Sequence, residues 1–315
     1  RRLPRPPRSS HARRARLHGQ MHSRDRDRAA IAFHYDLPQA FYETFLDPNL
    51  VYSCAYFADP DEDLATAQTR KLDLICHKLR LQPGMRLLDI GCGWGSLLLH
   101  AADNYGVAGV GATLSRTQAE AARTRLRDAG LADRVEVRLQ DYRDLGEQFD
   151  AIASVGMVEH VGPARLAEYT QTVHRLLAPG GLFCNHGIVT GDADQVRTGR
   201  ERTFVSAYVF PDGGLVPVWR AVQEIQRAGF EILDVEQLRP HYALTLRRWV
   251  DNLEANHDAA VATTSEADYR IWRAYMAGSA FSFSDRSLGV VQVLGRKPGD
   301  GAPDPPLGRA WMLPA

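Results

Sequence analysis

The chain has 315 residues, 44% of them hydrophobic, and its 38 basic side chains balance 38 acidic ones. This size and composition suit one large α/β domain or two small ones, and the zero net charge argues against a nucleic-acid-binding protein. No apolar run approaches the roughly 20 residues that a membrane-spanning helix needs. The four cysteines have no C-x-x-C spacing, so we expect free thiols in a reducing compartment and no metal site.

Residues 1–28 contain ten arginines and only two acidic residues, Asp25 and Asp27. Such a segment has little to bury, so we expect a disordered basic arm. An arm of this kind either binds anionic lipid, serves as a plain tail, or lies upstream of the true start, because Met21 is the first methionine.

Residues 29–85 are predicted to form a helical cap before the first strand. Pro38 interrupts any long helix, so a short helix is expected from about Gln39. Residues 51–57, VYSCAYF, are too aromatic for a linker. A helical pattern of apolar residues then covers residues 63–79 and ends at the turn signal QPG, residues 82–84.

The most informative stretch is RLLDIGCGWGS, residues 86–96. An apolar run that ends in glycines and precedes an amphipathic segment predicts a strand, a tight turn and a helix whose free N–H groups face a ligand. A dinucleotide site is disfavoured, because the third glycine, Gly95, comes one residue early and no acid follows residues 107–112. Asp89 instead suits a cofactor with a cationic amino-acid end, which indicates S-adenosylmethionine; an ordinary turn is the alternative.

Strands and helices alternate from this point. Strands are predicted at residues 86–90, 107–112, 135–139, 149–155 and 182–187, and helices at 96–104, 116–129 and 164–177. This alternation predicts a parallel, doubly wound α/β sheet. Ligands bind at the carboxyl ends of such strands, so one edge of the sheet should hold residues 91–95, 113–118, 140–143, 156–160 and 186–190.

Residues 188–285 are less regular. Residues 206–217 are rich in turn residues and are expected to cover the site. Further helices are predicted at 218–229, 239–256 and 269–283, and further strands at 230–238 and 287–295. We divide the chain into the arm 1–28, the cap 29–85, a domain at 86–296 with a substrate-covering insertion at about 192–285, and a loose tail at 297–315.

The motifs together resemble those of the cyclopropane fatty acid synthases, including the mycolic acid cyclopropane synthases. In chain order they are HYD at 34–36, YSCAYF at 52–57, LLDIGCGWG at 87–95, TLSRTQ at 113–118, QDYRDL at 140–145, VGMVEHVG at 155–162, YVFPDGG at 208–214 and HYALTL at 241–246. The resemblance covers about residues 34–292. It implies a Rossmann-like class I methyltransferase sheet with an N-terminal helical segment and a helical, acyl-binding insertion.

The resemblance also implies the reaction and the cofactor site. The enzyme would use S-adenosylmethionine to add a methylene across the double bond of an unsaturated acyl chain, in a phospholipid. The implied cofactor-binding residues are Asp89, Gly91, Cys92, Gly93, Tyr52 and Ser53 at the amino-acid end, Thr113 and Gln118 on the ribose side, and Asp141, Tyr142 and Arg143 around the adenine.

In this family a bicarbonate ion acts as the base. Attack of an alkene on the donated methyl leaves a carbocation, and a proton must then leave that methyl before the ring closes. The resemblance implies that the ion is held by the backbones of Cys54 and Val155 and by the side chains of Glu159, His186 and Tyr242. Without the resemblance, Glu159 could cap a helix, His186 could be structural, and nothing else singles out Tyr242.

One departure from the family pattern lies near the C-terminus, where Ser279 and Ser284 replace the usual cysteine and arginine. No covalent enzyme intermediate is needed, so we expect activity to survive. The alternatives are methyl transfer to an acyl chain without ring closure, methylation of a soluble natural product at carbon or nitrogen, and an inactive lipid-binding relative. The expected partners are an unsaturated acyl lipid, an anionic membrane surface and a second copy of the chain, in the cytoplasm or at the inner face of the membrane.

Overall fold

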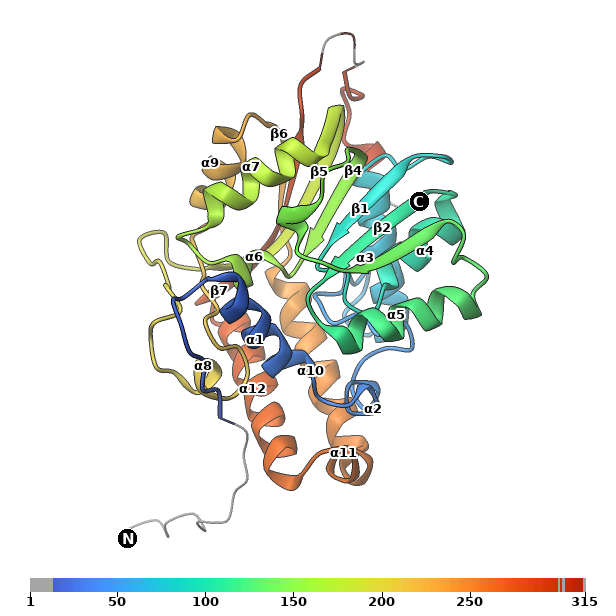
Figure 1. Cartoon of the computed structure of the whole chain (residues 1–315). Helices are drawn as coiled ribbons and strands as arrows, with labels where there is room; N and C mark the ends of the chain where they lie inside the picture. Colours follow the sequence, from blue (N-terminus) through green and yellow to red (C-terminus); the bar gives the residue numbers. More distant parts are fainter. Residues whose placement is uncertain (1–13, 300, 302–303, 314–315) are drawn as a thin grey trace, which may run out of the picture.

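The computed structural model describes residues 14–299, 301 and 304–313. Within these residues, a seven-stranded sheet has the order β3-β2-β1-β4-β5-β7-β6 (Figure 1). The strands are β1 Arg86–Ile90, β2 Ala108–Thr113, β3 Val135–Leu139, β4 Phe149–Val155, β5 Leu177–Thr190, β6 Glu231–Gln237 and β7 Leu288–Arg296. The first five strands pair in parallel, whereas β7 runs antiparallel to both of its neighbours. The predicted doubly wound α/β sheet is confirmed, with one antiparallel strand that the alternation did not indicate.

Strand β1 is buried on both faces in the middle of the sheet. Leu88 pairs with Val110 of β2 on one side and with Ile152 of β4 on the other. The chain order therefore reverses at β1, because β2 and β3 continue in one direction while β4 and β5 continue in the other. In doubly wound sheets, ligands bind at the carboxyl ends of the strands beside such a reversal.

Helices cover both faces of the sheet (Figure 1). One face carries α3 Leu64–Lys78, α4 Ser96–Tyr105 and α5 Arg116–Asp128, and the other carries α7 Leu166–Leu176 and α9 Val218–Arg227. Leu72 and Leu98 belong to the core of the first face, and Tyr169 and Ile225 to that of the second. These apolar stripes are what the helical spacing of the sequence predicts.

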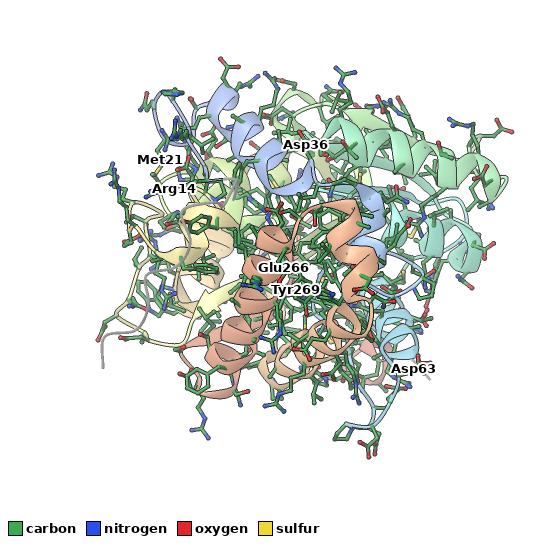
Figure 2. All side chains as sticks on the ribbon, turned by 90° about the horizontal axis from the view of Figure 1, so that it is seen from below. Arg14, Met21, Asp36, Asp63, Glu266 and Tyr269 are labelled. Carbon is green, nitrogen blue, oxygen red and sulfur yellow. The ribbon has the colours of Figure 1, made fainter. Side chains whose placement is uncertain are left out.

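A layer of helices lies beyond the carboxyl ends of the strands, at the bottom of Figure 1. Its members are α2 Gln39–Glu43, α10 Arg239–Ala255, α11 His257–Thr263 and α12 Glu266–Ser284. Helices α10 and α12 pack along each other, and their buried aromatic side chains include Trp249 and Trp272. Figure 2 shows this layer from below, with Glu266 and Tyr269 in the first turn of α12. Helices α10, α11 and α12 fall within the stretch expected to be a substrate-covering insertion, about residues 192–285, whereas α2 comes from the expected cap at 29–85.

Short elements complete the fold: η1 Tyr142–Asp144, α6 Val158–Val161, α8 Phe204–Tyr208 and η2 Ala310–Met312. Strand β5 is longer than predicted at both ends. At its start Leu177 pairs with Phe149 of β4, and at its end the strand pairs with β7 as far as Thr190↔Leu288. Among the described residues, no helix has the length and apolarity to cross a membrane.

The expectation of a disordered arm is wrong for residues 24–28, which form the first turns of helix α1 Arg24–Tyr35. Arg24 pairs with Asp144 at 2.8 Å, and Arg26 with Asp212 at 2.5 Å. Composition alone predicts disorder because these acidic partners lie more than a hundred residues away. Residues 1–13 of the expected arm lie outside the described residues.

The expectation of a loose C-terminal tail is also wrong for the residues described. The Lys297 ammonium donates to the backbone carbonyls of His174 and Leu177, at 2.8 and 2.7 Å. Arg309 pairs with the buried Asp234, and Met312 is 6% exposed in the core beside α3. The proline-rich composition suggested a solvated tail, but Lys297, Arg309 and Met312 have partners on the folded domain.

Candidate active site

The turn between β1 and α4 brings the backbone next to a cavity. Gly91, Gly93 and Gly95 have φ angles of +80°, +54° and +78°, a conformation that L side chains rarely adopt. A Cβ at Gly91 would also lie 3.4 Å from the Met157 sulfur. The glycines therefore let the chain turn sharply, and the first N–H groups of α4 remain available to a ligand.

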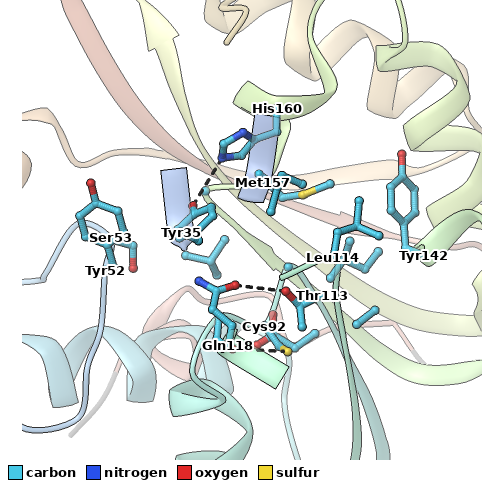
Figure 3. A pocket seen from close by; sticks show the side chains of 18 of the residues that line it. Tyr35, Tyr52, Ser53, Cys92, Thr113, Leu114, Gln118, Tyr142, Met157 and His160 are labelled. Atoms are coloured by element: carbon cyan, nitrogen blue, oxygen red, sulfur yellow. Dashed lines mark hydrogen bonds between the residues drawn. The ribbon is translucent and has the colours of Figure 1, made fainter. Parts of the chain in front are cut away.

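Every residue that the resemblance assigns to the cofactor lines this cavity (Figure 3). These residues are Tyr52, Ser53, Asp89, Gly91, Cys92, Gly93, Thr113, Gln118, Asp141, Tyr142 and Arg143. Of the strand ends predicted to share an edge, those at residues 91–95, 113–118, 140–143 and 156–160 contribute to its lining. The fifth, residues 186–190, does not line it but is hydrogen-bonded to Glu159, in the fourth of these stretches.

Polar side chains suited to an amino acid and a ribose face this cavity. Asp89 is 3% exposed, and burial raises the pKa of its carboxyl to about 7, against the effect of the Lys71 charge. A cationic group of a ligand would favour the ionised carboxylate. The Thr113 hydroxyl donates to Gln118 Oε1 at 3.1 Å, so these two side chains form one polar unit at the end of β2 (Figure 3).

Asp141 and Arg143, which also line the cavity, bind each other. Arg143 donates from Nε to Asp141 Oδ1 at 2.9 Å and from Nη2 to Oδ2 at 2.6 Å. Burial alone would raise the pKa of Asp141, but the hydrogen bonds and charge of Arg143 lower it overall. The pair therefore presents a fixed, charge-balanced edge beside the Tyr142 ring.

Helix α1 forms a wall of the cavity that the sequence did not predict. Asp27, Ala30, Ile31 and Tyr35 line it from this helix. Ion pairs hold the helix in place: Arg24 with Asp144, Asp27 with Arg143 at 3.3 Å, and Arg26 with Asp212. Pro211 and Asp212, from the turn-rich stretch expected to cover the site, line the cavity as well.

Glu159 lies in α6, directly after the end of β4. Its Oε1 accepts the backbone N–H of Ile188 at 2.5 Å, so the carboxyl joins α6 to the end of β5. Its Oε2 is buried with no hydrogen-bond partner among the described residues. Burial raises the pKa of Glu159 to about 7, and therefore part of the population keeps a proton at neutral pH.

His186 is buried on β5, directly opposite Val155 of β4. The Gln292 amide lies 3.2 Å from His186 Nδ1 and, as the donor, places the ring hydrogen on Nε2. Burial lowers the pKa of His186 to about 3, so the ring is neutral. Within the described part of the chain, Nε2 is buried without a partner, which leaves a donor directed at no protein group.

Tyr242 and Cys54 meet where the N-terminal cap packs against α10. The Cys54 thiol donates to the Leu238 carbonyl at 3.7 Å, and the Tyr242 N–H donates to the same oxygen at 3.2 Å. Burial raises the Tyr242 pKa well above its usual value, and the neighbouring ionisable groups of Tyr275, Cys54 and Glu159 add to this. Burial also raises the Cys54 pKa, so it stays a thiol and is no nucleophile.

Of the predicted catalytic residues, only Val155 lines the cavity. Cys54 and Glu159 are each next in sequence to a lining residue, Ser53 and His160. Glu159 lies near Tyr242, and His186 lies beside Val155, whose backbone continues into the cavity wall. Sequence reasoning missed Gln292, which orients His186, and Lys71, which lines the cavity. A signal for Lys71 exists: it occupies a position on the apolar stripe of α3, where a lysine needs a reason.

The sequence and the structure both match known proteins. A family model described as mycolic acid cyclopropane synthetase matches residues 22–293. A probable fatty acid methyltransferase of Pseudomonas putida is 44% identical over 92% of this chain and 75% of the relative. The cyclopropane-fatty-acyl-phospholipid synthase of Escherichia coli strain K12 is 40% identical over 83% of this chain and 66% of its own.

Among solved structures, the crystal structure of mycolic acid cyclopropane synthase CmaA1 complexed with SAH and CTAB superimposes with a TM-score of 0.80 and 34% sequence identity. The match covers 86% of this chain and 98% of the relative. Sequence and fold thus point to the same group of proteins as the motifs do.

Proposed function

The chain belongs to the mycolic acid cyclopropane synthetase family of S-adenosylmethionine-dependent methyltransferases, and from this we propose that it adds a methylene across the double bond of an unsaturated fatty acyl chain. The observation that carries the proposal is the pair of buried, unpaired polar atoms, Glu159 Oε2 and His186 Nε2, next to the cofactor cavity. An ordinary structural site would satisfy such atoms within the protein.

The cavity fits the family's cofactor. S-adenosylmethionine, when bound, supplies the methyl group. The glycine turn permits close approach of its amino-acid end, Asp89 offers a carboxylate to its ammonium, and Thr113 with Gln118 offers polar contacts to its ribose. Asp141, Tyr142 and Arg143 would surround the adenine. Closure of α1 over the cavity would exclude water from the transferred methyl.

The unpaired atoms fit a small oxyanion such as bicarbonate, which would supply a base when bound. The His186 Nε2–H would donate to it, and so would the protonated Glu159 carboxyl. Tyr242 would contribute a hydroxyl, and the backbones of Cys54 and Val155 would complete the set. Gln292 fixes the ring of His186, and the Ile188 N–H fixes the carboxyl of Glu159, so both groups are pre-oriented.

An acyl substrate suits the surroundings of this site. The layer formed by α2, α10 and α12 is rich in buried aromatic and aliphatic side chains, and Tyr242 and Tyr275 belong to it. The relative crystallised with CTAB, a single-chain amphiphile, supports a channel for an alkyl chain. We also propose that the enzyme meets its lipid at an anionic membrane surface, attracted by the arginines that precede α1.

The proposal is tested by the lipids of a bacterial host that lacks this activity. Expression of the chain should produce acyl chains heavier by one CH₂ unit, at the expense of monounsaturated ones. Glu159→Gln should lower this product at least 100-fold, since an amide cannot take up the proton that the bound base removes, although it keeps an acceptor for the Ile188 N–H. Glu168→Gln, an exposed change on α7, is the matched control. Unchanged lipids, with a soluble metabolite methylated instead, would contradict the proposal.

Methyl transfer without ring closure is the second candidate. It is favoured by the Pseudomonas putida relative, which is named a probable fatty acid methyltransferase, and by Ser279, which replaces the family cysteine. Proton spectra of the product lipids separate the two outcomes. Cyclopropane protons resonate far upfield, whereas a branched methyl or an exocyclic methylene does not.

A further inference from the structure

Lys71 is a buried lysine without an obvious structural role. It lies on α3 and is 2% exposed. Buried lysines normally need an ion pair, and Lys78 on the same helix has two, with Asp234 and Glu236, whereas Lys71 forms none within the described residues. Its Nζ donates to the Ser53 hydroxyl oxygen at 3.0 Å, and both side chains line the cofactor cavity.

The two carboxyl groups nearest to Lys71 differ in what they bind. Asp47 is engaged by its own loop, since its oxygens accept the N–H groups of Asn49 and Val51 at 3.0 and 2.9 Å. Asp89 lines the cavity beside Lys71. Burial lowers the Lys71 pKa to about 8, and the carboxyl groups of Asp47 and Asp89 oppose this, so the ammonium remains mostly charged at neutral pH. A lysine and a carboxyl group therefore line the same cavity.

We propose that Lys71 supplies the positive charge that holds the carboxylate of the cofactor's amino-acid end, acting through and beside the Ser53 hydroxyl. The Ser53 oxygen accepts a hydrogen bond from Lys71, so its own O–H is free to donate to the carboxylate. Asp89 takes the ammonium of the same amino acid. Two side chains of opposite charge thus match the two ends of a zwitterion. This inference rests on the family's use of S-adenosylmethionine.

The test is isothermal titration of the full chain with three ligands: S-adenosylmethionine, its decarboxylated analogue, and 5′-methylthioadenosine. Lys71→Met should raise the Kd for S-adenosylmethionine by about 10- to 100-fold, the usual effect of losing a charged hydrogen bond. It should change the Kd for the other two ligands less than about threefold, because they lack the carboxylate. Lys71→Arg should restore part of the preference for S-adenosylmethionine over the two ligands that lack the carboxylate.

Two further variants keep the test decisive. Ser53→Ala should show the same selective loss if Lys71→Met does not fold. Asp89→Asn should weaken the two ligands that carry an ammonium and spare 5′-methylthioadenosine. Equal weakening of all three ligands by Lys71→Met would mean that the lysine only supports the loop, and would overturn the inference while leaving the proposed function intact. A wild-type chain that binds no S-adenosylmethionine would overturn both.

Discussion

At the scale of single residues, the main evidence for a ligand-binding site is a set of buried polar atoms that have no hydrogen-bond partner. Leaving such an atom unpaired costs about 1–3 kcal/mol, so a folded protein rarely keeps several of them at one place without a ligand. Glu159 Oε2 and His186 Nε2 are in this state on neighbouring elements, and each partner atom on the same side chain is held by the protein. The site is therefore prepared for a group that the chain itself does not supply.

The buried carboxyl of Glu159 should make stability depend on pH. Its pKa is about 7 in the fold, against an ordinary 4.5. Between these values the unfolded chain ionises while the folded chain stays protonated, so the wild type loses stability as pH rises through this window. Glu159→Gln does not titrate. Its stability relative to the wild type should thus rise by up to about 3 kcal/mol between pH 4.5 and 7, and then stay constant.

Denaturant titrations of both ligand-free proteins at several pH values measure this difference. The Glu168→Gln variant, which removes an exposed carboxyl, is measured beside them for comparison. A constant difference between Glu159→Gln and the wild type across the window would show that the carboxyl is solvated in the folded state.

Motifs and glycines made the cofactor side of the site predictable, because the positive φ angles of Gly91, Gly93 and Gly95 leave a visible pattern in the sequence. Gln292 and Lys71 could not be identified in this way. Gln292 acts through His186, 106 residues away, and no local spacing records that contact. Lys71 acts through Ser53, 18 residues away, and its place on the apolar stripe of α3 is only an indirect signal. Whether Glu159, His186 and Tyr242 perform the predicted roles stays a prediction.

At the scale of elements, α1 connects the N-terminal segment to the cofactor cavity. Three of its charged side chains form ion pairs with residues of distant segments. Its residues Ala30 and Ile31 line the cavity. The strands were predictable because their apolar runs are long and regular. The helix was not, since its arginines favour a solvated chain until the fold brings Asp144 and Asp212 beside them.

The bond between Arg26 and Asp212 should therefore support cofactor binding. Arg26 donates to both carboxylate oxygens, at 2.5 and 2.8 Å, in a partly buried position. Arg26→Ala should raise the Kd for S-adenosylhomocysteine roughly tenfold and speed tryptic cleavage near residue 24, because α1 is released from the cavity. Arg28→Ala, which removes an exposed pair with Asp25 on the same helix, is the control. Equal affinities for both variants would contradict the role of α1 as a wall of the site.

At the scale of the whole molecule, the C-terminal segment belongs to the folded domain. Met312 packs in the core beside α3, the helix that carries Lys71, whereas Leu307 in the same segment is fully exposed. Met312→Ala should lower the free energy of unfolding by roughly 2–4 kcal/mol. Leu307→Ala should leave it nearly unchanged. Chemical denaturation measures the free energy of unfolding of both variants. Equal values for Met312→Ala and Leu307→Ala would mean that the C-terminal segment does not pack on the domain in solution.

The central claim is that the chain transfers a methyl group from S-adenosylmethionine to the double bond of an acyl lipid. The most direct measurement uses the purified protein, vesicles of a monounsaturated anionic phospholipid, and S-adenosylmethionine deuterated in its methyl group. Mass spectrometry of the acyl chains should find one added carbon that retains two of the three deuterium atoms, because one leaves to the base before the ring closes. Acyl chains that contain no deuterium would contradict the claim.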